Sequence, residues 1–266
     1  MALITMANSA SGESVIGRVA RIMSAFTRAR PFLTSAELAR ETGLSTSTAH
    51  RLARELAGEG FLDRDAEGRF GVGARLWELS ARSNPLEEFR RRGLPFLEGI
   101  HAAVRQQVSL AVPDIEGGTV LYLERLDQHG NETVNLGEVA ARLELTSTST
   151  GLAILAHEQQ DVRERYLVAA STDDGGRGLR AGLAEVRRRG YARLAGVLVE
   201  ANAGYAVPVF GAGNRVIGAI SVVVPLAEDR PELVLPVLVS AGQGLSRTMG
   251  AEKRPYGERE WLRGPG

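Results

Sequence analysis

The chain has 266 residues, of which 44% are hydrophobic and 24% charged, proportions that indicate a soluble globular protein, most simply one with two domains of unequal size. Its formal net charge of zero excludes binding to nucleic acid through overall charge, so any such binding must depend on local clusters of basic residues. The absence of cysteine excludes disulfides, thiolate nucleophiles and cysteine-based zinc sites.

Residues 1–13 are small and polar, and we expect them to form a flexible terminus. They lack a charged segment followed by a long apolar run, so they do not resemble a signal peptide. The longest apolar stretches, such as residues 216–224, are too short to span a membrane. We therefore expect a cytoplasmic protein without a membrane partner.

Three helices are predicted next. Apolar residues recur at three- and four-residue steps from Val15 and predict a helix that ends before Pro31. Residues 35–42 predict a short second helix, capped by Thr34 or Ser35 and stopped by Gly43. A third helix follows, with Ser45 as its N-cap and Gly58 or Gly60 at its end.

Residues 61–73 then predict two short strands around a turn at 65–68. A helix over 74–82 ends near Asn84 and Pro85, and we place the domain boundary within 74–85. A longer helix follows over 86–106, with a bend predicted at Gly93 and Pro95.

The rest of the chain mixes strand and helix patterns, which favours an α+β or α/β domain with a central sheet. Strands are predicted at 108–114, 119–126, 205–210 and 216–225, and helices at 150–159, 161–170, 179–190 and 231–249. Residues 250–266 are polar, contain Gly and Pro, and predict a flexible tail.

The third helix has two different faces. Ala49, Leu52, Ala53 and Leu56 share one of them, and polar residues occupy the other. A helix-turn-helix needs this division, because one face packs on partner helices while the other enters the major groove. We predict DNA contacts by residues of this helix, its neighbours and the hairpin, namely Arg18, Ser35, Thr46, Ser47, Thr48, His50, Arg51, Arg54 and Arg69.

Simpler interpretations of this region stay open. A small three-helix domain with a solvated polar face gives the same pattern. Between Ser14 and Trp77, ten Arg residues face seven acidic residues, but a codon bias towards Arg would give the same excess. His50 alone is equally well explained as an ordinary surface residue.

Three motifs carry a resemblance to the IclR family of bacterial transcriptional regulators. They are LTSAELARETGLSTSTAHRLARELAGEGFLDRDAEGRFGVGARLWEL, LTSTSTGLAILA, and the run from RRRGYA through GYAVPVFGAGNRVIGAISVVVP. The resemblance extends over residues 14–249, nearly the whole chain.

The resemblance implies a mixed α/β protein. Its expected parts are a winged helix-turn-helix domain over residues 14–75, a linker helix over 76–85, and an effector-binding and oligomerisation domain over 86–249, with a central sheet somewhat like a GAF or PAS sensor. Members of the family form dimers or dimers of dimers, bind palindromic or pseudo-palindromic operators, and respond to small catabolic intermediates, commonly organic acids or aromatic compounds.

The chain departs from the family pattern at three places. Leu152 stands where many members have Lys, residues 193–197 replace an acidic cluster, and Gly204 stands where a Cys is often found. These departures leave the expected fold intact but do not support the carry-over of a specific acid-binding pocket.

Five consecutive hydroxyl residues, 146–150, precede a predicted helix. Their hydroxyls and the free N–H groups of a helix start can bind a carboxylate, phenol or amide oxygen, although helix capping alone explains them too. The resemblance places this loop at an effector pocket, formed by Leu143, Ser147, Thr148, Ser149, Thr150, Asn202, Gly204, Ser221 and Val223. Few charges and many hydroxyls favour a neutral or aromatic ligand over a small dianion.

Two other classes of function are considered. A hydrolase could use Ser or Thr residues together with His101, His129 or His157 as nucleophile and base. The sequence, however, contains no G-x-S-x-G elbow and no metal-binding H-E-x-x-H pair. A purely structural DNA-binding protein would not need so large a second domain. We expect a regulator with no catalytic or metal-binding residues and no cofactor.

Overall fold

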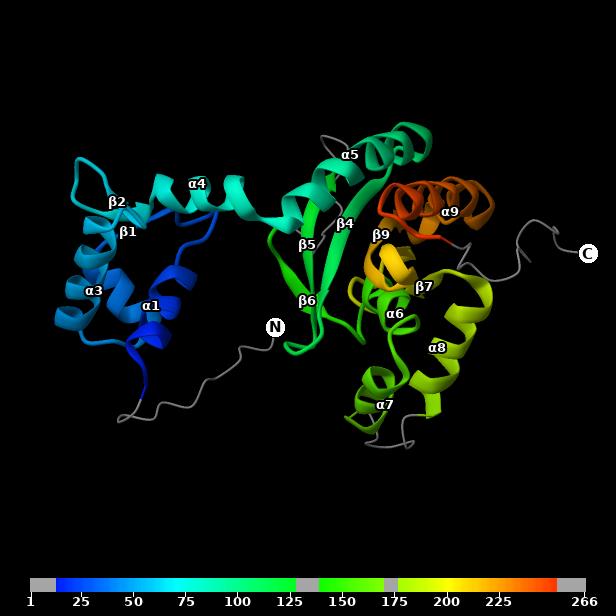
Figure 1. Ribbon diagram of the computed structural model, residues 1–266, viewed down its shortest axis with the longest axis horizontal. Helices are drawn as coiled ribbons and strands as arrows, with labels where there is room; N and C mark the ends of the chain where they lie inside the picture. The colour runs from blue at the N-terminus through cyan, green and yellow to red at the C-terminus, as the bar shows by residue number, and fades with distance from the viewer. Residues whose placement is uncertain (1–12, 128–138, 170–176, 253–266) are drawn as a thin grey trace, which may run out of the picture. The chain divides into compact units, whose positions relative to one another are not determined.

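The computed structural model describes residues 13–127, 139–169 and 177–252. The chain divides into two compact units, Met1–Glu87 and Glu88–Gly266, and each is described by itself (Figure 1). The predicted flexible ends, 1–13 and 250–266, lie almost entirely outside the described residues, as does His129.

The first unit holds helices around a small antiparallel sheet with the strand order β1-β3-β2. Its helices are α1 (Val15–Ser24), α2 (Ser35–Thr42), α3 (Thr46–Gly58) and α4 (Ala74–Ser83), and its strands are β1 (Phe32–Leu33), β2 (Leu62–Arg64) and β3 (Phe70–Val72). The predicted order of helices followed by a hairpin is confirmed. Strand β1 was missed, because two residues are too few for a period-two pattern.

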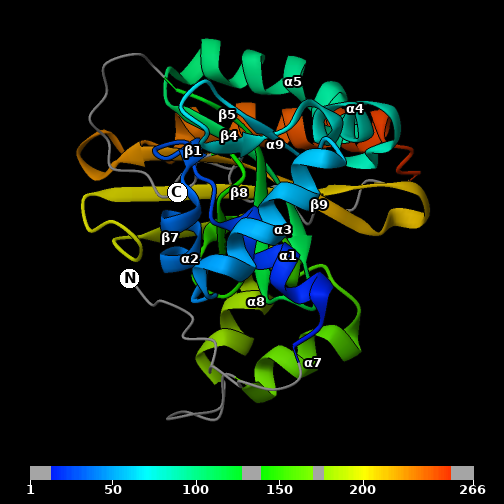
Figure 2. The same ribbon diagram turned by 90° about the vertical axis from the view of Figure 1, so that its left-hand side faces the viewer.

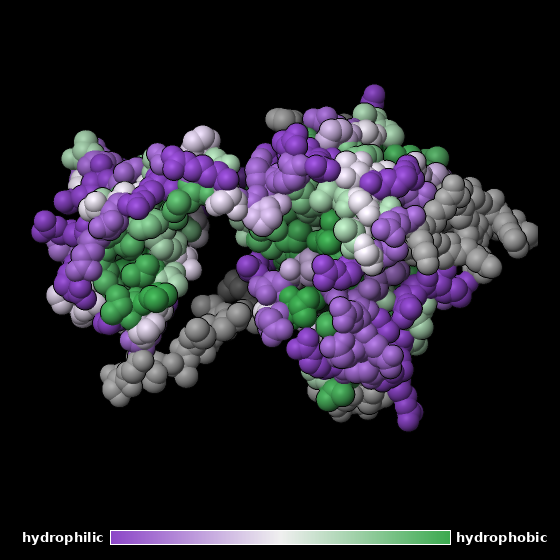
Figure 3. Space-filling model, in the orientation of Figure 1, coloured by the Kyte–Doolittle hydropathy of each residue, from purple (hydrophilic) through white to green (hydrophobic). Residues whose placement is uncertain are grey.

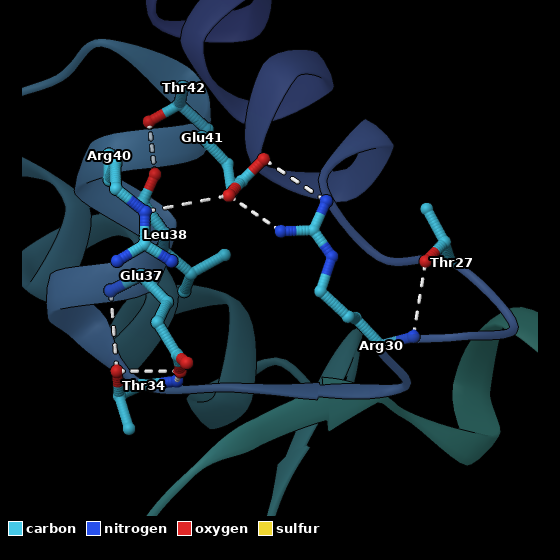
Figure 4. A network of polar contacts seen from close by, with 8 residues as sticks. All are labelled: Thr27, Arg30, Thr34, Glu37, Leu38, Arg40, Glu41 and Thr42. Atoms are coloured by element: carbon cyan, nitrogen blue, oxygen red, sulfur yellow. Dashed lines mark hydrogen bonds and ion pairs between the residues drawn. The ribbon is translucent and has the colours of Figure 1, made fainter.

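Local sequence signals fix the ends of α2. The Thr34 hydroxyl accepts a hydrogen bond from the Glu37 N–H, and the Glu37 carboxylate accepts one from the Thr34 N–H, which makes a capping box (Figure 4). Gly43 ends the helix with a φ of +67°, a conformation that side chains disfavour. Arg30 binds Glu41 through two hydrogen bonds and ties the preceding loop to this helix.

The core of the first unit comes from all three leading helices and the sheet. Its fully buried large side chains are Ile22, Leu33, Leu38, Leu52, Leu62 and Phe70. The predicted inner face of α3 is confirmed, since Ala49, Leu52 and Ala53 are all buried. The polar face of this helix is therefore left to the outside.

The second unit is built on a six-stranded antiparallel sheet with the order β6-β5-β4-β9-β8-β7. The strands are β4 (Gln107–Asp114), β5 (Thr119–Leu126), β6 (Arg142–Glu144), β7 (Ala192–Ala195), β8 (Asn202–Phe210) and β9 (Val216–Pro225). The two edge strands, β6 and β7, were not predicted, because they are short and carry exposed Arg or Glu among their apolar residues.

Helices cover both faces of this sheet (Figures 1 and 2). They are α5 (Pro85–Val104), α6 (Ser149–Leu155), α7 (Gln160–Ala169), α8 (Arg177–Arg189) and α9 (Pro231–Thr248). Gly93 of α5 lies so close to Leu110 of β4 that a Cβ there would come within 2.6 Å of the leucine. On the other face, the Tyr122 hydroxyl of β5 donates to Thr150 of α6. The central sheet thus separates α5 and α9 from α6, α7 and α8.

One helix prediction needs correction. Helix α6 ends at Leu155, whereas residues 150–159 were expected to be helical. Helix α5 continues through Pro95, as the predicted helix over 86–106 does. Within the described ranges, no helix is both long and apolar enough to cross a membrane.

Candidate functional site

The polar face of α3 is presented by a well-capped helix. Ser45 lies in the N-cap position, and its hydroxyl accepts a hydrogen bond from the Thr48 N–H. Thr46 and Ser47 follow as exposed residues of the first turn. Short hydroxyl side chains at this end leave room for a phosphate to approach the backbone N–H groups.

Arg51 and Arg54 are the exposed cations of the same face. Arg51 donates to the Glu55 carboxylate at 2.7 Å, and both side chains are more than half exposed. An exposed pair at this spacing stabilises a helix by only a few tenths of a kcal/mol, about 0.3–0.5. The Arg51 guanidinium can therefore leave Glu55 for a stronger partner at little cost.

His50 and Ser35 are in contact with each other. The Ser35 Oγ lies 2.8 Å from the His50 Nδ1, which joins α2 to α3. The imidazole also meets the ring of Phe70 edge-on, with 6.4 Å between centroids. His50 is half-buried, so its first role in this arrangement is to pack the two helices of the motif together.

The two other arginines predicted to contact DNA, Arg69 and Arg18, lie outside α3. Arg69 donates to Asp65 at 2.7 Å, and its guanidinium lies over the ring of Phe32. Arg18 of α1 is half-buried, and its Nε is buried without a hydrogen-bond partner among the described residues. The structure thus gathers the α3 residues on one surface, whereas Arg69 belongs to the β2–β3 turn and Arg18 to α1.

The second unit contains a cavity with an empty volume of about 590 Å³, part of it open to solvent. All nine residues predicted for the effector pocket line it, namely Leu143, Ser147, Thr148, Ser149, Thr150, Asn202, Gly204, Ser221 and Val223. Thr146, which precedes them in the hydroxyl run, is exposed and does not line it.

The floor of the cavity is one face of the sheet. Gln107 and Ser109 alternate along β4, and their partners across the ladder are Val223 and Ser221 of β9. Gly204 of β8 lies opposite Val223 in turn. Side chains two residues apart in a strand point to the same side, so three adjacent strands place these groups together.

Helix α6 starts at the other wall of the cavity. The Thr148 hydroxyl caps it by accepting from the Gly151 N–H at 2.8 Å. The Tyr122 hydroxyl donates to the Thr150 Oγ1 at 3.2 Å, and burial raises the pKa of the Tyr122 phenol, so its proton stays in place. The helix cap and the pocket wall, treated as alternatives from the sequence, are the same residues.

Seven lining residues were missed by sequence reasoning, namely Gln107, Ser109, Tyr122, Leu194, Val197, Leu198 and Val199. A signal existed for the first two, because polar residues alternate with apolar ones at the start of a strand that is otherwise apolar. The segment 197–199 joins β7 to β8, and Val197 and Leu198 are about half exposed. No pattern in a single sequence places such a loop.

The two histidines that the structure describes in this unit, His101 and His157, do not supply a catalytic base to the cavity. His157 does not line it and has its Nδ1 2.9 Å from the Ala153 carbonyl oxygen. Burial lowers the pKa of His157 to about 4. His101 has its Nδ1 2.8 Å from the Gln106 carbonyl oxygen. Among the described lining residues there is no carboxylate, imidazole or amine that could take up a proton.

Comparison with known proteins extends over both units. Residues 15–66 match the model of the IclR helix-turn-helix domain, and residues 87–245 match that of the bacterial transcriptional regulator IclR C-terminal domain. The glycerol operon regulatory protein of Streptomyces coelicolor is 27% identical, over 81% of this chain and 88% of its own. The regulator KipR of Bacillus subtilis is 25% identical, over 83% and 91%.

Among solved structures, an IclR homolog from Microbacterium hydrocarbonoxydans, complexed with 4-hydroxybenzoate, is 34% identical, with a TM-score of 0.79. The match covers 90% of this chain and 100% of that one. An IclR transcriptional regulator from Alicyclobacillus acidocaldarius, at 23% identity and a TM-score of 0.73 over 88% and 98% of the two chains, shares the fold.

Proposed function

This chain belongs to the IclR family of bacterial transcriptional regulators, and on that premise we propose that it binds an operator as a homodimer or a dimer of dimers, under the control of a small organic molecule bound in the cavity. A helix-turn-helix domain and a C-terminal effector domain make it an IclR-type transcriptional regulator. The family consists of regulators and not of enzymes.

The operator contact is assigned to α3, and the exposed hydroxyls and arginines on its polar face carry this assignment. Thr46, Ser47 and Thr48 are close enough to the helix start for phosphate contacts, while Arg51 and Arg54 have the reach for base edges or phosphates. Ser35 and His50 are assigned a supporting role, because their contact joins α2 to α3. Arg18 and Arg69 are assigned to the edges of the DNA-contacting surface.

Self-association is supported by apolar side chains that the first unit leaves exposed. Helix α4 has no buried residue, and its Trp77 is 74% exposed. Val15 and Ile16 of α1 are also exposed, and Figure 3 shows apolar surface gathered on this unit. Exposed patches of this kind mark protein contacts, and a two-fold dimer matches the two half-sites of a palindromic operator.

The effector is assigned to the aromatic compounds and small organic acids or amides of a catabolic pathway. The cavity, lined by all nine predicted residues, carries this proposal. The 4-hydroxybenzoate complex of a relative and the glycerol operon regulators among the others support a catabolic operon as the target.

The experiment that tests the whole proposal is operator binding by the full chain. Fluorescence anisotropy with DNA from the upstream region of its own gene should give specific binding that survives competitor DNA. A panel of aromatic acids, amides and phenols should then contain compounds that change this affinity. Binding without any preference over competitor DNA would contradict the proposed regulator.

A further inference from the structure

We infer that the cavity selects an uncharged ligand, a phenol or a carboxamide in preference to a carboxylate anion, and that the hydroxyls of Ser109, Ser149 and Ser221 hold its polar group. This inference rests on the proposed function, because it takes the cavity to be the effector site. It adds the charge of the ligand and the residues that recognise it.

The three serines have little exposed surface, and their hydroxyls have no protein partner. Ser109 is 2% exposed, Ser149 7% and Ser221 3%, and all three line the cavity. None of these hydroxyls has a hydrogen-bond partner among the residues that the structure describes. Among the described residues, the buried side-chain atoms that lack a partner are Arg18 Nε and Arg21 Nε, so the three serine hydroxyls are reached through the cavity and are not sealed in the core. Three hydroxyls without a protein partner therefore remain available to hydrogen-bond a molecule that enters the cavity.

Ser246 is a buried serine with a structural role. It is 2% exposed, as Ser109 is, but its Oγ accepts from the Phe210 N–H at 3.0 Å and donates to the Gly242 carbonyl at 2.7 Å. Residue type and burial are the same in the two cases. The difference lies in the hydrogen bonds, so Ser246 gives a matched control for the serines of the cavity.

Backbone register brings the hydroxyls together. Ser109 and Ser221 are direct Cα partners on β4 and β9. Ser149 reaches the same region from α6, because a Cβ on Gly204 would lie 2.8 Å from its Oγ. Glycine at this position thus leaves the space that the Ser149 hydroxyl occupies. Hydroxyls from the sheet and from α6 thus line the same cavity.

The charge of the ligand follows from what the lining lacks. Among the described lining residues there is no Arg, Lys or His to pair with an anion. Burying an unpaired carboxylate is far more costly than burying a neutral polar group. Hydroxyls, with the amides of Gln107 and Asn202, can both donate and accept, which suits a phenol or carboxamide. Leu143, Leu194 and Val197 supply apolar surface for a ring.

The first test measures stability without any ligand. Ser109→Ala/Ser221→Ala should melt at the same temperature as the wild-type full chain or higher, because no hydrogen bond is lost. Ser246→Ala should melt lower, because the Phe210 N–H loses its acceptor. If the melting temperature of the double variant falls as far as that of Ser246→Ala, the inference is overturned, because the cavity serines would then stabilise the folded protein.

The second test uses two probes of nearly equal shape, 4-hydroxybenzamide and 4-hydroxybenzoate, in isothermal titration at pH 7.5. We expect the wild type to bind the amide at least about tenfold more tightly. Each lost hydroxyl should weaken amide binding by roughly three- to tenfold, while Ser246→Ala should retain the wild-type preference. Equal or tighter binding of the benzoate overturns the inference, and so does binding of neither probe.

Operator binding by the same preparations separates the two proposals. Wild-type DNA affinity together with failed probe binding overturns the ligand inference and leaves the regulator function standing. Absence of specific DNA binding contradicts the regulator function whatever the probes do.

Discussion

The Glu55 carboxylate accepts a 2.7 Å hydrogen bond from the Arg51 guanidinium one turn earlier on α3. Both groups lie on the face assigned to DNA, so Glu55 competes with phosphate for the same cation. Mutations can therefore distinguish the roles of the two residues. Removing Glu55 frees Arg51 for DNA, whereas removing Arg51 abolishes its contact with DNA.

Arg51→Ala should weaken operator binding by about 1–3 kcal/mol if Arg51 reads a base, and should relax specificity at one position. If it touches phosphate alone, binding to all sequences should weaken and the salt dependence should become shallower. Glu55→Gln should strengthen binding. Gel-shift titrations at several salt concentrations measure both effects. Arg247→Ala, at an exposed position of the other unit, is the control. Wild-type affinity in both Arg51→Ala and Arg54→Ala would rule out this face of α3 as the DNA-binding surface.

Trp77→Ser should weaken self-association, because a 74% exposed indole on a helix without buried residues is a large apolar surface to leave in water. Sedimentation velocity of the full chain should show a dimer or tetramer for the wild type and a shift towards monomer in the variant. A wild type that sediments only as monomer at micromolar concentration would exclude the proposed assembly.

Gly151→Ala should destabilise the second unit by several kcal/mol, on the order of 2–5, because a Cβ there would lie 2.1 Å from the Leu145 carbonyl oxygen. Gly182→Ala is the matched control in α8, where a Cβ meets nothing within 4 Å. It should be neutral or stabilise the chain by about 0.5–1 kcal/mol, since alanine favours the helix. Thermal melts of both variants decide this, and equal melting temperatures would contradict the close approach.

His157 should make the second unit sensitive to acid. Burial lowers the pKa of His157 to about 4 from an ordinary value of 6.5, so the unfolded chain binds a proton that the folded chain excludes in this interval. Its stabilising contribution is complete above pH 6.5 and is lost as the pH falls towards 4, by about 3 kcal/mol in all. His157→Leu should lose less stability than wild type over this interval. Denaturant titrations at pH 7, 5.5 and 4 measure the free energy of unfolding of both proteins. Equal losses in wild type and variant would mean that His157 is accessible to protons in the folded protein.

Gly204→Ala should leave the fold intact but lower the affinity for any ligand held by Ser149. The new Cβ would lie 2.8 Å from the Ser149 Oγ, and a serine hydroxyl can turn away from it at little cost. Titration with whichever probe the wild type binds should show a loss, with no change in melting temperature. Wild-type affinity would show that the Ser149 hydroxyl does not face the ligand.

How far the sequence predicts this molecule depends on the range of each interaction. Capping residues such as Thr34, Ser45 and Gly43 act within one turn, so the helices of the first unit could be predicted. The hydroxyl run before α6 was predicted as a candidate wall for the same reason. Membership of the family, and not spacing, linked this run to Asn202, Gly204 and Ser221.

Ser109 could not be assigned in this way. Its role depends on pairing with Ser221, more than one hundred positions later, and that pairing is set by the β4–β9 register. The loop residues Val197 and Leu198 were missed for a related reason, because exposed apolar residues in a turn have no periodic pattern. Pairings between distant strands were thus the missing information.

The adjacency of β4 and β9 also has a consequence for synthesis of the protein. The first unit, which includes α4, is complete once the ribosome has passed Glu87. The cavity floor, in contrast, needs β9, which ends at Pro225. Contacts between such distant segments form late and slowly. A chain that terminates prematurely before Val216 would therefore retain the helix-turn-helix segment without the ligand site, so truncation would produce a DNA-binding fragment that no longer responds to its signal.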